Sequence, residues 1–122
     1  MEPFVTTPPP DDLAFFAFFE VEPILLDPSV PWVYNTATYE TVRDGCLVHF
    51  RIQPSYSTLR VTLIIEDREI SEAEVAEFKD LEIVADNGRE TLIARFGDCA
   101  ASALYLTLKP KVRLSVVVGS DS

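Results

Sequence analysis

Hydrophobic and polar residues alternate with a period of two along most of the chain after residue 45. Residues 46–53 and 59–66 form two such runs, separated by the turn-forming stretch 54–58. Because successive side chains of a β-strand point to opposite faces of a sheet, these runs predict a hairpin with one buried face. The same alternation returns later, in residues 81–85, 92–96, 104–108 and 114–118. The pattern therefore predicts about six antiparallel strands.

Turn residues separate the later runs at the places where a sheet needs them. Asn87-Gly88 stands between residues 81–85 and 92–96, and both residues tolerate a positive φ, which makes this pair a strong hairpin signal. Pro110, between two lysines, interrupts the chain before the last run. These signals predict that the C-terminal strands pair as consecutive antiparallel neighbours.

Two short helices are expected beside the strands. Asp11 or Asp12 can cap a helix that begins at Leu13, although the apolar run 13–19 is also compatible with a buried strand.

The second helix is expected within residues 69–80. Ser71 and Glu74 have the spacing of a capping box, and Val75, Phe78 and Leu81 recur at helical spacing. This pattern predicts about two turns of helix with a solvated acidic face.

The N-terminal third differs from the rest of the chain in composition. Residues 1–42 hold seven of the nine prolines and seven acidic residues, but no Lys or Arg. Prolines at this density favour an irregular segment with short elements only. We therefore expect residues 1–42 to form a proline-rich acidic lead that packs on an antiparallel β core of residues 43–118.

The expected fold is mainly β, in the α+β class, within one domain of residues 1–122. An antiparallel sheet of about six strands, curled or sandwich-like, would carry one or two short helices. Since the strands are one-sided, the segment 13–19 and the helix near Val75 are the candidates to cover the apolar face. The chain has 122 residues and is 48% hydrophobic, which suffices for a core without metals or disulfides.

Two features of the sequence predict a soluble, cytoplasmic protein. The densest apolar run, 13–19, is far shorter than the roughly 20 residues that a membrane-spanning helix needs. Residues 1–10 carry no Lys or Arg, unlike the start of a secretory signal. Cys46 and Cys99 are then expected to be free thiols, unless their strands are neighbours and allow a disulfide.

Charge is the most informative property of this sequence. Twenty acidic and ten basic residues give a net charge of −10, which argues against direct binding to nucleic acid. Six of these net charges come from residues 66–82, whose acids outnumber Arg68 and Lys79. The acidic residues of this run are Glu66, Asp67, Glu69, Glu72, Glu74, Glu77, Asp80 and Glu82. They predict either a solvated face or an electrostatic docking surface for a basic protein.

Aromatic side chains would supply the anchors that charge alone does not provide. Four aromatic residues stand in predicted loops or at strand edges, and such residues are frequent hot spots of interfaces; they are Trp32, Tyr34, Tyr39 and Tyr56. For Trp32 a role in capping the core is the competing interpretation. We include Trp32, Tyr34 and Tyr56 with the acidic run as the candidate partner-binding site.

No catalytic, metal or cofactor site is expected. His49 is the single histidine, and neither a nucleophile motif nor a phosphate-binding glycine loop accompanies it. Cys46 and His49 are three residues apart in a predicted strand and so point to opposite faces, which argues against zinc.

Three of these features together resemble a known class of proteins. They are the strand start at Asp44-Gly45, the alternating strands from Cys46 to Val118, and the acidic run 66–82. The chain resembles the immunity proteins of bacterial polymorphic, contact-dependent and type VI toxin systems. This resemblance implies a stoichiometric inhibitor that binds one cognate toxin domain, and a nuclease with a basic cleft would account for the acidic balance.

Other functions remain compatible with the sequence. A phage or mobile-element inhibitor that mimics DNA would use the same acidic surface. A small enzyme or ligand-binding barrel would need His49, Tyr56 and a carboxylate to line a cavity. A structural module could dimerise through a sheet edge at the apolar final strand, residues 113–118.

Overall fold

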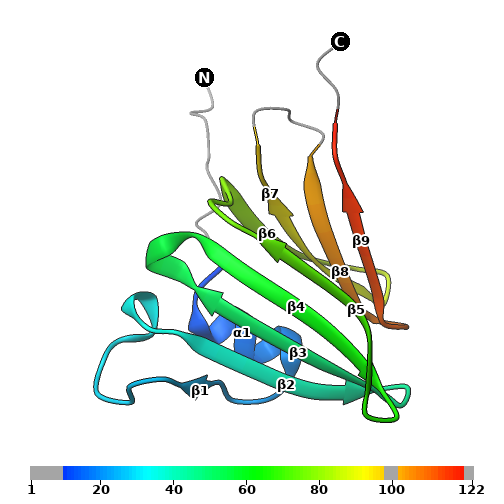
Figure 1. The fold of residues 1–122 in the computed structure, drawn as a ribbon, viewed down its shortest axis with the longest axis horizontal. Coiled ribbons are helices and arrows are strands. Elements are labelled where there is room, and N and C mark those ends of the chain that lie inside the picture. The colour runs from blue at the N-terminus through cyan, green and yellow to red at the C-terminus, as the bar shows by residue number, and fades with distance from the viewer. Residues whose placement is uncertain (1–9, 98–101, 120–122) are drawn as a thin grey trace.

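The computed structural model describes residues 10–97 and 102–119, which form two open antiparallel sheets and one α-helix (Figure 1). Sheet A has the strand order β1 (Ile24–Leu25), β2 (Ala37–Arg43), β3 (Cys46–Gln53), β4 (Thr58–Ile65) and β5 (Arg68–Val75). Sheet B has the order β6 (Asp80–Asp86), β7 (Arg89–Arg95), β8 (Ala103–Lys109) and β9 (Arg113–Val117). The expected mainly β, antiparallel fold class is confirmed.

All pairs of neighbouring strands follow each other in the chain, so the sheets are built from hairpins. Two hairpin turns place Asp44-Gly45 and Asn87-Gly88 at positive φ, with values of 54°, 75°, 53° and 79° in that order. These are the backbone angles that such tight turns require. The expected strand pairs around residues 54–58 and around Asn87-Gly88 are both present.

Helix α1 (Asp12–Phe19) covers the inner face of sheet A. The Asp11 side chain accepts a hydrogen bond from the Ala14 amide at 3.0 Å, as expected of an N-cap. Glu20 ends the helix in the left-handed conformation, and its amide donates to the Phe16 carbonyl at 2.7 Å. The alternative of a buried strand at residues 13–19 is thereby excluded.

The core joins the helix to both sheets in one apolar cluster. Phe15, Phe18 and Phe19 of α1 are buried, and the Phe19 ring lies 4.9 Å from the ring of Tyr39 and 5.0 Å from that of Phe50. Sheet B contributes its own buried row, which consists of Leu92, Ala94, Leu104, Leu106 and Leu108. The segment 13–19 therefore covers the apolar face, as expected.

The expectation of a helix within residues 69–80 is wrong. This segment contains strand β5, a short link and the start of β6. In β5, Ala73 and Val75 lie opposite Val61 and Leu59 of β4, and Val75 is buried. Because a period-two pattern of Ala73 and Val75 fits the inner face of sheet A, pairing with the free edge of β4 prevails over the capping-box spacing.

The structure also has more strands than the six expected. In the described residues there are nine, and the additional ones are β1, β2 and β5. Strand β2 pairs with β3 from Ala37 to Arg43, so the proline-rich segment supplies a long strand of sheet A at its end. Its alternation was masked in the sequence because its buried positions include Thr41, a polar residue.

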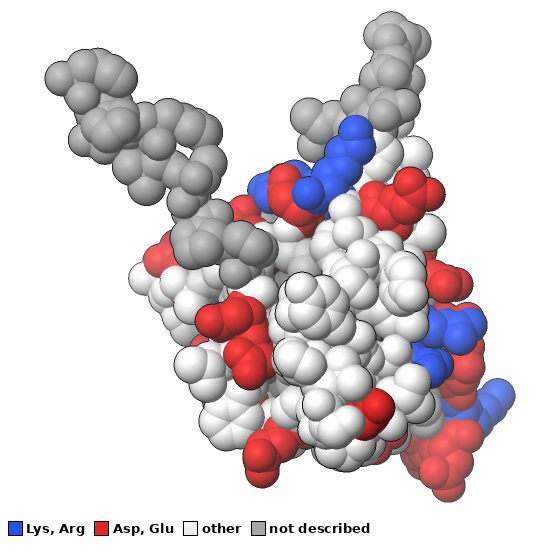
Figure 2. Space-filling view, turned by 90° about the vertical axis from the view of Figure 1, so that its left-hand side faces the viewer, with Lys and Arg blue, Asp and Glu red and all other residues white. Residues whose placement is uncertain are grey.

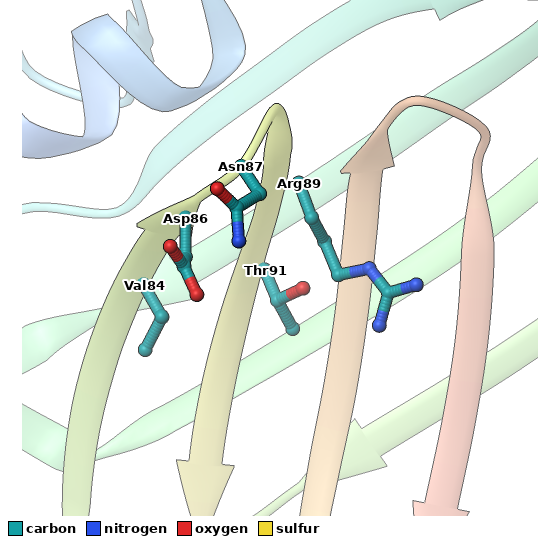
Figure 3. Close-up of a pocket in the computed structure, with 5 residues that line it drawn as sticks. All are labelled: Val84, Asp86, Asn87, Arg89 and Thr91. Carbon is teal, nitrogen blue, oxygen red and sulfur yellow. The ribbon is translucent and has the colours of Figure 1, made fainter.

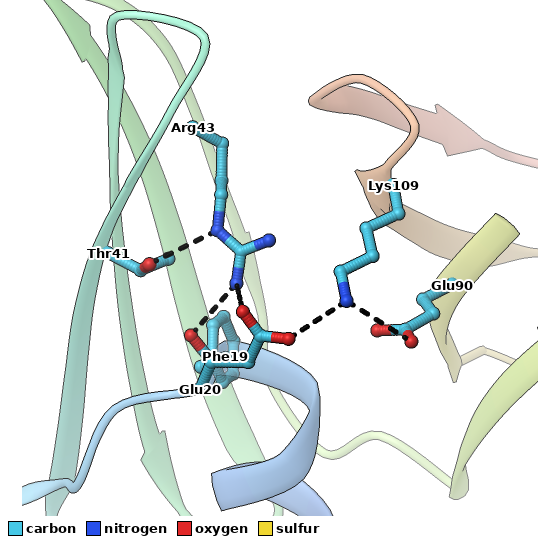
Figure 4. Close-up of polar contacts among 6 residues, drawn as sticks. All are labelled: Phe19, Glu20, Thr41, Arg43, Glu90 and Lys109. Atoms are coloured by element: carbon cyan, nitrogen blue, oxygen red, sulfur yellow. Dashed lines mark hydrogen bonds and ion pairs between the residues drawn. The ribbon is translucent and has the colours of Figure 1, made fainter. Parts of the chain in front are cut away.

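Polar contacts tie the C-terminal end of α1 to both sheets (Figure 4). One Glu20 oxygen accepts from Arg43 of β2 at 3.1 Å, and the other accepts from Lys109 of β8 at 2.8 Å. The hydrogen bond from Lys109, together with the charges of Lys109 and Arg43, holds the pKa of Glu20 below its ordinary value. Arg43 also donates to the Phe19 carbonyl at 3.1 Å, which satisfies a helix-end acceptor.

Candidate partner-binding surfaces

The acidic run lies on two consecutive edge strands instead of on one helix face. Glu66 and Asp67 form the turn between β4 and β5, both with positive φ. Three of the other acids stand on β5, the edge of sheet A, and two on β6, the edge of sheet B; Glu77 lies in the link between these strands. Edge strands with charged side chains resist pairing with other chains, so this placement serves the fold as well.

Ion pairs among the described residues engage three of the eight carboxylates of the run. Glu72 pairs with Arg60 at 2.9 Å, and Arg95 pairs with Asp80 at 2.9 Å and with Glu82 at 3.2 Å. The remaining acids form no ion pair within residues 10–97 and 102–119, and they are Glu66, Asp67, Glu69, Glu74 and Glu77. Such exposed carboxylates are available to attract a basic partner.

Two of the three predicted aromatic anchors are exposed on adjoining turns. Tyr34 ends η1 (Trp32–Tyr34), Tyr56 ends η2 (Pro54–Tyr56), and these two 3₁₀-turns lie side by side. The two tyrosines are 69% and 71% exposed. Figure 2 faces the end of the molecule that carries these turns and shows a largely uncharged surface with carboxylates around it.

Trp32 belongs to the core more than to this surface. Its indole N–H donates to the Tyr39 hydroxyl at 2.9 Å, and its ring lies 5.4 Å from the Phe15 ring. Burial is the main cause that raises the pKa of Tyr39 to about 12, against a smaller lowering by the hydrogen bond from Trp32. The core-capping interpretation of Trp32 fits this arrangement.

A main-chain hydrogen bond connects the aromatic turns with the acidic run. The Phe78 amide donates to the Ser57 carbonyl at 2.8 Å. Ser57 directly follows Tyr56, and Phe78 directly follows Glu77, so the aromatic side chain and the carboxylate belong to adjoining segments. The structure thus brings Tyr34, Tyr56 and Glu77 to one end of the molecule, whereas Glu66 and Asp67 lie at the far end of β5.

The outer face of sheet A carries basic residues that sequence reasoning missed. Arg51 and Arg60 are directly opposite each other on β3 and β4, next to Glu74 on β5. Like charges in opposite positions destabilise a sheet, so Arg51 and Arg60 repel each other, and the neighbouring carboxylates offset part of this repulsion. His49 lies on the same face and pairs with Glu40 at 3.5 Å. The strand alternation placed these side chains together on one face, but only the register showed that they meet.

Sheet B has a shallow pocket of about 360 Å³ beside its first hairpin turn (Figure 3). Its lining residues are Val84, Asp86, Asn87, Arg89 and Thr91. Arg89 also lines a neighbouring pocket of about 290 Å³ together with Lys111 and Arg113. This second pocket gathers three cations on a protein that is acidic overall.

A larger groove of about 480 Å³ separates α1 from the segment that leads into η1. Its apolar lining residues are Leu13, Phe16, Pro23, Leu25, Val30, Pro31 and Trp32. Asp12 and Glu22 add two carboxylates. Sequence reasoning treated residues 13–19 as core only; the signal for a second role was that apolar residues surround this helix on all sides.

The described residues, 10–97 and 102–119, lack both a metal-binding cluster and a membrane-spanning helix. They hold no group of three or more His, Cys, Asp or Glu side chains arranged to bind a metal ion. None of the helices in these ranges combines the length and the apolar character that crossing a membrane requires. Cys46 is buried and free, and Cys99 lies outside the described residues.

Comparisons with known proteins agree with the fold. No protein-family model matches the chain, and curated protein sequences give no match. The fold is similar to that of a chain from a contact-dependent growth inhibition toxin–immunity protein complex of Klebsiella pneumoniae 342. The TM-score is 0.71 at 16% sequence identity, and the match covers 88% of this chain and 93% of that chain. The resemblance to toxin–immunity systems is therefore confirmed at the level of the fold.

Proposed function

We propose that this chain is an immunity-type protein that acts in the bacterial cytoplasm and neutralises a cognate toxin domain by binding to it one to one. The observation that carries the proposal is the similarity in fold to one chain of a toxin–immunity protein complex. This match covers 88% of the present chain and 93% of the chain from the complex. The chain would act by occupying a surface of the toxin and would catalyse no reaction itself. Its net charge of −10 suits a basic partner, and we propose a nuclease domain.

The binding surface that we propose combines an acidic field with aromatic anchors. Glu74 and Glu77 form no ion pair among the described residues, and their carboxylates would accelerate association and favour basic partners, because opposite potentials steer the encounter. Tyr34 and Tyr56 then supply apolar contact area, which dominates the affinity of most interfaces. Their position beside Glu77 allows one partner to contact both kinds of group.

Charge reversal in a matched pair of variants tests this surface. The partner is the toxin domain encoded beside this chain's gene, and its dissociation constant is measured over a range of salt concentrations. Glu74→Lys with Glu77→Lys should weaken binding about tenfold or more at low salt and flatten the salt dependence. The control, Glu40→Lys with Asp86→Lys, changes the net charge equally but lies on other strands, and it should retain most of the affinity.

Two outcomes would contradict the proposal at different levels. Equal affinity of the Glu74/Glu77 variant and the wild type at low salt would remove this surface from the interface. Absence of any binding to the neighbouring gene product, and of any protection of cells that produce it, would refute the immunity role itself.

A further inference from the structure

The groove between α1 and the residues before η1 has exposed apolar walls that the fold does not need. Leu13 is 71% and Phe16 is 46% exposed, although Phe15, Phe18 and Phe19 of the same helix are buried. The helix therefore already has a complete buried face, and its second apolar side faces solvent. Exposed apolar side chains that gather around a groove are typical of an interaction site.

The opposite wall of the groove is held in place by hydrogen bonds. Asn35 is buried, and its amide group donates to the carbonyls of Asp27 and Val30 at 2.6 and 2.9 Å. Its side-chain oxygen accepts from the amides of Asp27 and Thr36 at 3.2 and 2.9 Å. Trp32 is fixed in turn by its bond to Tyr39. A wall that is already ordered loses little entropy on binding, which favours affinity.

The charge around the groove is of one sign. Asp12 and Glu22 line it, and neither forms an ion pair with a Lys or Arg among the residues that the structure describes. The sequence has no basic residue before Arg43, so the segment that builds the groove cannot neutralise these carboxylates. A ligand with a positive charge beside an apolar side chain would complement both the lining and the rim.

We infer that this groove is a second docking site for the same partner, and that it accepts a segment of that partner in which an apolar side chain stands next to Lys or Arg. The apolar side chain would lie against Leu13, Phe16 and Trp32, and the cation would face Asp12 or Glu22. This inference rests on the proposed function for the identity of the partner, but the geometry of the groove stands apart from the acidic run.

A peptide titration tests the chemistry of the groove without the toxin. The probes are the blocked peptides Arg-Leu-Leu-Arg and Glu-Leu-Leu-Glu, added to the full-length protein and followed by NMR. The basic peptide should shift the resonances of Leu13, Phe16 and the Trp32 indole, and the acidic peptide should not. Asp12→Asn with Glu22→Gln should reduce these shifts several-fold. No shifts at these positions, or equal shifts with both peptides, would overturn the inference.

A second experiment uses the toxin domain itself. Leu13→Ala with Phe16→Ala should weaken binding about tenfold, as expected for two side chains of an interface hot spot. The control, Leu26→Ala with Val42→Ala, removes two side chains that are 74% and 64% exposed outside the groove, and it should bind like the wild type. Circular dichroism of all variants checks that the fold persists.

The two experiments separate the inference from the proposed function. If the toxin domain binds the wild type and the groove variant equally, the groove is not a docking site, while the immunity role stands. If the toxin domain does not bind at all, the proposed function fails, and the peptide titration still decides whether the groove selects cationic apolar segments.

Discussion

Glu20 and Lys109 are 89 positions apart in the chain and form an ion pair with 2.8 Å between Oε2 and Nζ. This contact joins the end of helix α1 to strand β8 of sheet B. The other Glu20 oxygen is bound to Arg43 of sheet A at 3.1 Å. The C-terminal end of the helix is thus attached to both sheets.

Loss of the Lys109 charge should change how stability depends on pH. The hydrogen bond from Lys109 lowers the pKa of Glu20 in the folded protein. The contribution of this bond to stability is therefore present above the ordinary pKa of 4.5, and it is lost as the pH falls through the lowered pKa of Glu20. Lys109→Met should therefore be less stable than the wild type at neutral pH, and the difference should shrink toward about pH 2. Urea unfolding of both proteins between neutral pH and about pH 2 measures this difference in unfolding free energy. Lys111→Met is the control, and a difference that stays constant with pH would contradict the assignment.

Adjacent phenylalanines of α1 should respond very differently to truncation. Phe15 is fully buried against Trp32, Tyr39 and Phe50, so Phe15→Ala should cost about 3–5 kcal/mol of unfolding free energy. Phe16 is 46% exposed, and Phe16→Ala should cost about 1 kcal/mol or less. Chemical denaturation of both variants gives the comparison. Similar losses for the two would mean that Phe16 belongs to the core and not to an open groove.

Removal of the Asn35 side chain should loosen the loop that forms the far wall of the groove. Asn35→Ala leaves the carbonyls of Asp27 and Val30 without their side-chain donor, which should cost about 3 kcal/mol. Ser29→Ala in the same loop removes an exposed bond to Asp27 and should cost less than about 1 kcal/mol. Denaturation midpoints and amide exchange of residues 27–35 report the effect, and an equal loss in both variants would argue against the special role of Asn35.

One of the four tyrosines should ionise at unusually high pH. The pKa of Tyr39 is raised to about 12, mainly by burial, from an ordinary value of 10.0. Because the unfolded chain releases this proton near pH 10 and the folded chain only near 12, stability should fall as the pH rises between these values. Ultraviolet difference absorbance follows the titration. Tyr39→Phe should remove the step near pH 12, and its persistence would assign it to another group.

Charge on the edge of sheet A should keep the protein from self-association. Glu69→Thr with Glu74→Thr would remove two of the three carboxylates of β5 and leave Glu72, which pairs with Arg60. Because the open edge then carries less charge and more strand-forming residues, sedimentation should show oligomers that the wild type lacks. The Lys replacements at the same positions should stay monomeric, since either sign of charge protects an edge. Monomeric behaviour of the Thr variant would leave partner binding as the better explanation of these acids.

The elements that sequence predicted well are those with strong local signals. The alternation in β3 and β4, the Asn87-Gly88 turn and the Asp11 cap each act within a few residues, and all are present in the structure. For residues 69–80 the sequence pattern predicted a helix, whereas the structure has strand β5 and the start of β6 there. The free edge of β4 decided between helix and strand, and such an edge is a property of the sheet and not of the segment.

In the candidate site, too, some features followed from local sequence signals and others only from the tertiary structure. Tyr34 and Tyr56 were predicted as exposed aromatic residues and are exposed, whereas Trp32 is held in the core by Tyr39. The groove had no sequence signal of its own, since Leu13 and Phe16 have the same residue types as the buried positions beside them. Which side of α1 is covered depends on where the helix docks.

The sequence by itself determined the β-rich class, the two strong hairpins and the acidic balance, because alternation, turn conformations and charge are local or additive properties. Only the tertiary structure decided that residues 69–80 extend into two sheet edges, that Tyr56 and Glu77 become neighbours, and that one side of α1 stays open. These features arise from contacts between distant segments, and their free energies depend on which surfaces remain after the whole chain has packed.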